Sequence, residues 1–141
     1  MKFMIMLNGN QAAYDAMSGK PSDGHPTWSE GDLKAMFEHM STLNDDLAES
    51  GEFVDGQGLA DPRQARSVTA AADGSPVVSD GPYGETKEVL AGYWIVDVDR
   101  PERAYEIAAR AHRCPTPEGS AANPPLTVRP LDDPSQAGCE V

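Results

Sequence analysis

Two apolar segments stand out in the sequence, and both are typical of buried strands. The first, KFMIMLN at residues 2–8, ends at an Asn-Gly turn signal. The second, VLAGYWIVDV at residues 89–98, is the most strand-like segment of the sequence. Side chains alternate between the two faces of a strand, and residues 3–7 and 93–98 are largely apolar at both odd and even positions. Strands here would therefore present apolar side chains on both faces of a sheet.

Between these segments, apolar residues recur at helical spacing and predict a helix over residues 29–50. The recurring positions are Leu33, Met36, Phe37, Met40, Leu43 and Leu47. Thr27 and Glu30 have the spacing of a capping box, and Gly51 suits the position just past a helix end. A second helix is predicted over residues 101–112.

Pro101 suits the first turn of that second helix, and Asp99 can cap it. A shorter helical turn is indicated around Gln11–Met17.

The remaining strand signals are shorter. Residues 52–59 form a short strand with glycines in a turn or bulge, and residues 126–131 form a final strand. Residues 65–72 and 76–80 are predicted to pair through the Asp-Gly turn between them. The order of elements is therefore β-α-β-β-α-β, which predicts an α+β fold with helices on one face of an antiparallel sheet.

We expect one domain over residues 1–131, followed by a polar tail at 132–141. Two helices can cover only one face of the sheet, so the other apolar face requires a cover. A second copy of the chain is the simplest cover, and the sequence therefore predicts a homodimer that buries sheet against sheet.

The composition excludes some partners. The chain has 141 residues and a net charge of −12, so a basic footprint for nucleic acid or an anionic membrane is missing. No apolar run approaches the roughly 20 residues of a membrane helix, and no small-residue cleavage site follows the first strand. We expect a cytoplasmic protein in which Cys114 and Cys139 are reduced thiols. No zinc-ligand spacing and no phosphate-binding loop occurs, so no cofactor is expected.

Residues 80–88, DGPYGETKE, resemble the DGPF motif of the YCII-related proteins, which is usually written DGPFAETKE. Tyr83 replaces Phe and Gly84 replaces Ala. The resemblance extends to MKFMIMLNGN, EFVDGQGLADP, GYWIVDVD and TVRPL. It implies a dimeric, ferredoxin-like α+β barrel. In such proteins a histidine and an aspartate are proposed to share a pocket, and the matching positions here are His39 and Asp80. Some relatives act in the breakdown of chlorinated aromatics, and others are encoded beside sigma factors of the extracytoplasmic-function class.

Two interpretations of these residues stay open. His39 and Asp80 form an acid–base pair in a small cofactor-independent lyase or isomerase, with Tyr83 and Glu85 contacting a small organic substrate. Alternatively, His39 is a half-buried helix residue with a satisfied hydrogen bond, and Asp80 only stabilises its turn. The chain would then be a non-catalytic ligand-binding or regulatory module, in association with a sigma factor.

Overall fold

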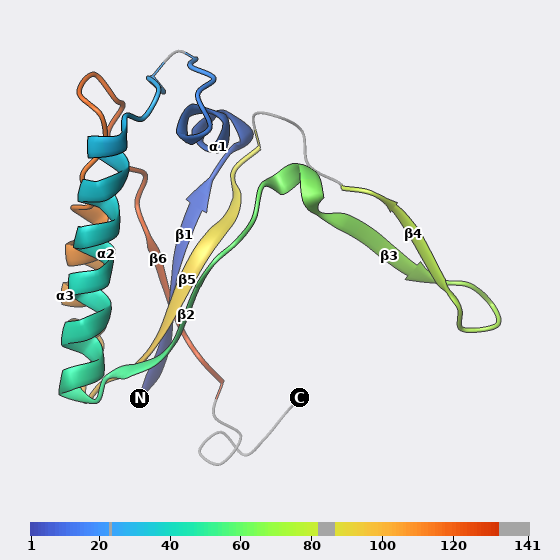
Figure 1. The fold of residues 1–141 in the computed structure, drawn as a ribbon. Helices are drawn as coiled ribbons and strands as arrows, with labels where there is room; N and C mark the ends of the chain where they lie inside the picture. The colour runs from blue at the N-terminus through green and yellow to red at the C-terminus, as the bar shows by residue number, and fades with distance from the viewer. Residues whose placement is uncertain (23, 82–86, 133–141) are drawn as a thin grey trace.

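The structure is a computed structural model that describes residues 1–22, 24–81 and 87–132. Its centre is a four-stranded antiparallel sheet in the order β2-β5-β1-β6. Two long helices, α2 and α3, lie side by side on one face of this sheet (Figure 1). The strands of the sheet are β1 (Lys2–Gly9), β2 (Phe53–Gly58), β5 (Val89–Asp97) and β6 (Thr127–Pro130), and the helices are α1 (Gln11–Met17), α2 (Glu30–Ser50) and α3 (Pro101–His112). The fold is α+β and ferredoxin-like, as the sequence predicted.

The hydrophobic core lies between the sheet and the two long helices. Alternate strand residues point into it, and α2 and α3 contribute the facing side chains. Its buried members are Phe3, Ile5, Leu43, Leu47, Trp94, Val96, Val98, Ala104, Ile107, Ala108 and Ala111. The predicted stripe on α2 is only partly correct, because Phe37 in its N-terminal half is 62% exposed. The buried part of the stripe is confined to the C-terminal half of α2.

The other face of the sheet, here called the open face, is not covered by α2 or α3 (Figure 1). Met4, Met6, Tyr93 and Ile95 alternate with the core residues of β1 and β5, so they point to this face. All four are half-buried. As expected from the sequence, β1 and β5 carry apolar side chains on both faces, and on the open face these side chains form an apolar centre.

The start of α2 differs from the prediction. Ser29, not Thr27, is the N-cap: its side chain accepts a hydrogen bond from the backbone of Asp32, which reciprocates in a capping box. The backbone N–H of Trp28 donates to Ala16 O at 3.2 Å, which holds the chain outside the helix up to this point. Gly51 ends the helix in the left-handed region with φ 78°, as predicted.

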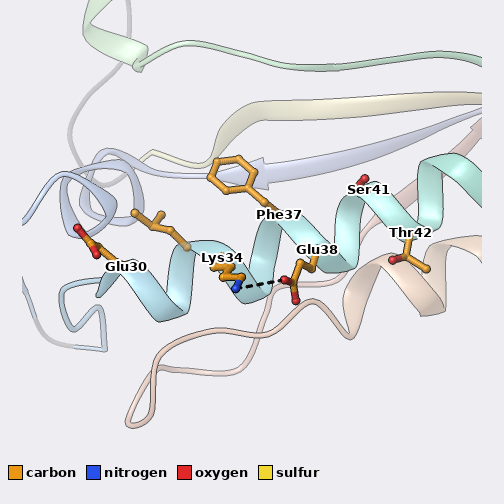
Figure 2. Close-up of a pocket in the computed structure, with 7 residues that line it drawn as sticks. Glu30, Lys34, Phe37, Glu38, Ser41 and Thr42 are labelled. Carbon is orange, nitrogen blue, oxygen red and sulfur yellow. Dashed lines mark ion pairs between the residues drawn. The ribbon is translucent and has the colours of Figure 1, made fainter.

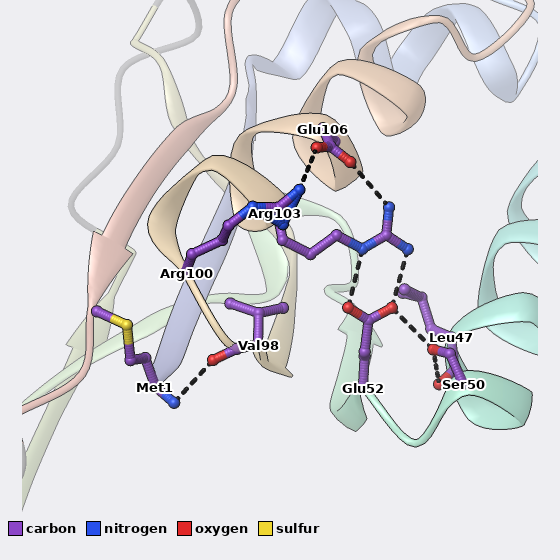
Figure 3. Close-up of polar contacts among 8 residues, drawn as sticks. All are labelled: Met1, Leu47, Ser50, Glu52, Val98, Arg100, Arg103 and Glu106. Carbon is purple, nitrogen blue, oxygen red and sulfur yellow. Dashed lines mark hydrogen bonds and ion pairs between the residues drawn. The ribbon is translucent and has the colours of Figure 1, made fainter.

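The start of α3 differs too. Pro101 occupies the first turn, as expected, but the N-cap is Arg100 and not Asp99. The residue before a proline is held extended, and Arg100 has φ −151°, so Asp99 lies one position too early. No side chain caps this end. Instead, Arg103 in the first turn binds Glu52, the residue that follows Gly51 (Figure 3).

The predicted hairpin forms, but it stands apart from the main sheet. Among the described strands, β3 (Arg66–Ala70) and β4 (Pro76–Asp80) pair with each other and with no other strand, and a short 3-10 helix, Pro62–Gln64, precedes them. Figure 1 shows this ribbon extending away from the sheet, on the side opposite α2 and α3. Gly74 has φ 88° in its turn, which favours glycine there. We call β3, β4 and their turn the arm.

Candidate functional site

His39 lies on the side of α2 that meets α3. It is half-buried, and its Nε2 is 2.8 Å from the backbone oxygen of Arg110. A carbonyl oxygen can only accept, so Nε2 carries the hydrogen in this contact. Arg110 is in the last turn of α3, where its carbonyl oxygen also accepts the backbone N–H of Arg113 at 3.3 Å. His39 therefore ties α2 to the C-terminal end of α3.

Asp80 is the last residue of β4 and is exposed. It lies opposite Arg66 in the arm, whereas His39 lies in the helix layer on the other side of the sheet (Figure 1). Within the described part of the chain, no hydrogen bond or ion pair joins these two side chains. Their predicted pairing stays a prediction. Tyr83 and Glu85, the predicted substrate contacts, lie outside the described residues.

A surface hollow runs along the outer side of α2 (Figure 2). Its lining residues are Glu30, Leu33, Lys34, Phe37, Glu38, Ser41 and Thr42. Every one of them comes from this single helix, so no second element among the described residues encloses the hollow. Lys34 and Glu38 form an ion pair at 3.9 Å across it, and both are largely exposed. Of the predicted site residues that the structure describes, neither His39 nor Asp80 lines the hollow.

A polar pair that the sequence did not reveal lies on the open face. The hydroxyl of Tyr93 on β5 donates to Asp55 Oδ2 on β2 at 2.9 Å. Asp55 Oδ1 also accepts the backbone N–H of Gly56 at 2.8 Å. The hydrogen bond to Asp55 raises the pKa of Tyr93, and burial and the negative charge act in the same direction. The tyrosine therefore stays protonated and keeps its oxygen lone pairs available.

The chemistry of this pair is that of a hydrogen-bond acceptor. The phenol hydrogen is committed to the carboxylate, so the tyrosine oxygen and the remaining carboxylate lone pairs can accept N–H or O–H groups. The pair borders the apolar centre formed by Met4, Met6 and Ile95. An apolar surface with a few placed polar groups is typical of small-molecule sites.

A second polar cluster holds the loop that leads into the arm. Gln11 on α1 is only 5% exposed, and its Nε2 donates to Asp15 at 3.0 Å and to Asp61 at 3.1 Å. Arg63 binds both oxygens of Asp15, at 3.1 and 3.2 Å. The hydrogen bond from Gln11, followed by those from Arg63, lowers the pKa of Asp15. Tyr14 adds a bond to Leu59 O at 2.9 Å.

The described residues contain no group of three or more histidine, cysteine, aspartate or glutamate side chains that could hold a metal ion. Among the helices described, none is both long enough and apolar enough to cross a bilayer.

The missed residues could not be found from spacing alone. Tyr93 and Asp55 are 38 positions apart, and only the register of β2 against β5 brings them together. The bulge between Phe53 and Asp55 shifts that register, and no local feature of the sequence predicts the bulge.

Comparison with known proteins agrees with the family resemblance of the sequence. The chain is 27% identical over 104 residues to an uncharacterized protein of Rhizobium meliloti (strain 1021), an alignment that covers 74% of this chain and 79% of that protein. The YCII-related domain matches residues 1–125, which include every strand of the main sheet except β6. With its ferredoxin-like fold and this match over most of its length, the chain belongs to the YCII-related family.

Proposed function

We propose that the protein is a homodimeric small-molecule-binding module in which the open faces of two sheets meet around the Tyr93–Asp55 pair. The observation that carries this proposal is the open face itself. It has an apolar centre of Met4, Met6 and Ile95 beside a hydrogen-bonded acceptor pair. Methionine side chains adapt their shape, which suits a surface that accommodates both a partner and a ligand.

The position of His39 favours binding over catalysis. Its Nε2 is engaged with the end of α3, which is the structural role considered for this residue from the sequence. A neutral ring would have only Nδ1 left to accept a proton. An acid–base enzyme built on His39 and Asp80 is the alternative, and it requires Asp80 to approach the helix layer. NMR of the His39 imidazole protons in the wild type and in Asp80→Asn tests this alternative. We expect the signals to have the same chemical shifts in both proteins. Different shifts would favour the enzyme.

The ligand class follows from the acceptor pair. A small apolar molecule that carries a hydroxyl or amine fits an apolar surface with an acceptor at its border. Benzyl alcohol is a suitable probe, and benzyl methyl ether is its matched control because it keeps the ring and removes the donor. We expect benzyl alcohol at millimolar concentration to shift the amide NMR signals of Asp55 and Tyr93. The ether, which cannot donate a hydrogen bond, should shift them at least threefold less.

The dimer is tested separately by sedimentation. Ile95→Asp places a charge at the centre of the open face and should dissociate the dimer. Thr42→Asp places the same charge on the exposed outer side of α2 and should leave the dimer intact. A wild type that is monomeric at tens of micromolar would refute the whole proposal. A dimer that responds equally to alcohol and ether would refute the ligand class.

The cytoplasmic location and the sigma-factor association stay predictions. Co-purification of the tagged protein with an extracytoplasmic-function sigma factor, lost in Ile95→Asp, would tie the association to the dimer.

A further inference from the structure

We propose that the arm packs on the second copy of the chain, so that each protomer of the dimer is held by its partner's β3–β4 ribbon. This inference rests on the homodimer proposed above. Every residue of β4 and all of β3 except Ser67 are exposed. Val68 and Val78, which pair directly across the arm, are 61% and 58% exposed.

An arm of this kind gains stability from a cover. An isolated two-stranded hairpin is marginally stable at best in water, and additional strands or packing of one face against another element supply the missing burial. Val68 and Val78 form the centre of one face of the arm. On the same face, the pair Ala70–Pro76 lies nearer the turn, and the pair Arg66–Asp80 lies nearer the root. This face is apolar except at its root, which suits a protein surface.

The direction of the arm is fixed by its root. The buried Gln11 and the two bonds from Arg63 to Asp15 attach the preceding loop to α1. On the returning side, a side chain at Gly81 would come within 2.7 Å of Ala65 O, so glycine permits the strands to close at the root. These contacts hold the root of the arm in one orientation relative to the sheet.

That direction leads toward the predicted partner. The arm extends from the side of the sheet opposite the helices, which is the side on which the second copy would lie (Figure 1). Strands of 5 residues each reach about 17 Å at 3.3 Å per residue, and facing sheets pack about 10 Å apart. The arm is therefore long enough to pass beyond the partner's sheet.

The contact area also favours a second copy. The main strands have 8, 6, 9 and 4 residues, which project to about 430 Å² at 3.3 Å by 4.8 Å per residue. A stable interface buries about 800 Å² per partner. Even when the unevenness of the surface is allowed for, the contact area of the sheet alone lies near the lower limit for a stable interface. One arm face adds about 160 Å² to the contact of its own protomer, and the partner's arm covers about the same area again. Together these two contributions raise the projected contact area of each protomer by about three quarters over that of the sheet alone.

The symmetry of the arrangement explains why the occupant is another copy. In a two-fold dimer each arm contacts the partner, and both apolar ribbon faces are covered at once in a closed assembly. The net charge of −12 argues against nucleic acid as the occupant.

The test compares two neighbouring substitutions on opposite faces of the arm. Val68→Asp changes the apolar face, and Thr69→Asp puts the same charge on the other face at a residue that is also exposed. Sedimentation equilibrium should show a dimer dissociation constant at least tenfold higher for Val68→Asp and less than threefold higher for Thr69→Asp. In mixed dimers of labelled and unlabelled chains, isotope-filtered NOEs should connect the Val68 and Val78 methyl groups to the partner.

The outcomes separate this inference from the one beneath it. A monomeric wild type would overturn both the dimer and the arm. A dimer without intermolecular NOEs to the two valines, or with equal effects of the two substitutions, would overturn the arm alone. Since both positions are exposed within one chain, loss of folding is not expected from either substitution. Circular dichroism of each variant checks this directly.

Discussion

The ion pair between Glu52 and Arg103 should be among the strongest polar links in the fold. The guanidinium binds the carboxylate in a bidentate arrangement, with Nε to Oε2 and Nη2 to Oε1 both at 2.8 Å (Figure 3). The Glu52 side chain is 17% exposed and the Arg103 side chain is 35% exposed. Ser50 donates to the same carboxylate at 2.8 Å. The pair joins the turn after α2 to the first turn of α3, which no side chain caps.

A double-mutant cycle with Glu52→Gln and Arg103→Met measures the coupling. A charge-assisted hydrogen bond contributes about 1.5–3 kcal/mol, whereas an exposed ion pair contributes about 0–1 kcal/mol. Since the arginine is one-third exposed, we expect a coupling of about 1–2 kcal/mol between these limits. For 141 residues at about 2.1 cal/mol/K each, 1 kcal/mol corresponds to roughly 3 °C in Tm.

The pH dependence has a defined sign. The hydrogen bond from Arg103 is the main cause that lowers the pKa of Glu52 below its ordinary value of 4.5. A carboxylate whose pKa is lowered by folding stabilises the native state above the unfolded pKa and loses this contribution as the pH falls below it. The difference in stability between the wild type and Glu52→Gln should therefore be complete at pH 7 and shrink below about pH 4.5.

Urea denaturation at one fixed protein concentration measures both effects, because dimerisation would otherwise change the apparent stability. The exposed pair Lys34–Glu38, at 3.9 Å, is the matched control. Glu38→Gln should cost less than about 0.5 kcal/mol. A coupling below that value for Glu52 and Arg103, or a difference that persists unchanged at pH 3, would refute the reasoning.

Three further predictions concern single side chains. His39→Ala should cost about 1 kcal/mol and speed amide exchange in the last turn of α3, and unchanged exchange would show that the bond to Arg110 is not stabilising. Asn44→Ala removes the acceptor 2.8 Å from Trp94 Nε1 and should cost about 1–2 kcal/mol in urea, with a smaller loss arguing that water replaces it. Burial raises the pKa of Cys114 to about 11, so in a Cys139→Ser background its thiol should react with a disulfide reagent at pH 8 at least about tenfold more slowly than free cysteine, and fast labelling would contradict this.

The elements themselves were largely predictable, because their signals are local. The apolar spacing over residues 29–50 and the glycine at position 51 defined α2 at both ends to within a residue. The caps were harder. Thr27 and Ser29 each precede an acidic residue by three positions, and only the tertiary bond from Trp28 to Ala16 decides between them. The family, too, was predicted from the sequence, and the match over residues 1–125 confirms it.

The candidate site was harder to predict than the fold because it depends on register and direction. The Asp-Gly turn correctly indicated a hairpin, but nothing local distinguishes a hairpin within a sheet from a ribbon that leaves it. The interpretation of His39 as a half-buried helix residue with a satisfied hydrogen bond agrees with the structure. The contact of His39 with Arg110, however, depends on how α3 crosses α2, which a single sequence does not determine.

The Asp80–Gly81 step can now be interpreted from its position, whereas Pro82 lies outside the described residues. Asp80 ends the arm, and Gly81 lies where a side chain would meet Ala65 O at 2.7 Å. Glycine permits this close approach without strain. On the opposite side of the same root, a buried amide and a bidentate arginine hold the incoming loop. Such contacts set an angle between the arm and the sheet. If the arm packs on a second copy, this angle decides whether the two open faces meet in register, and Asp80, first interpreted as a catalytic residue, would act through assembly.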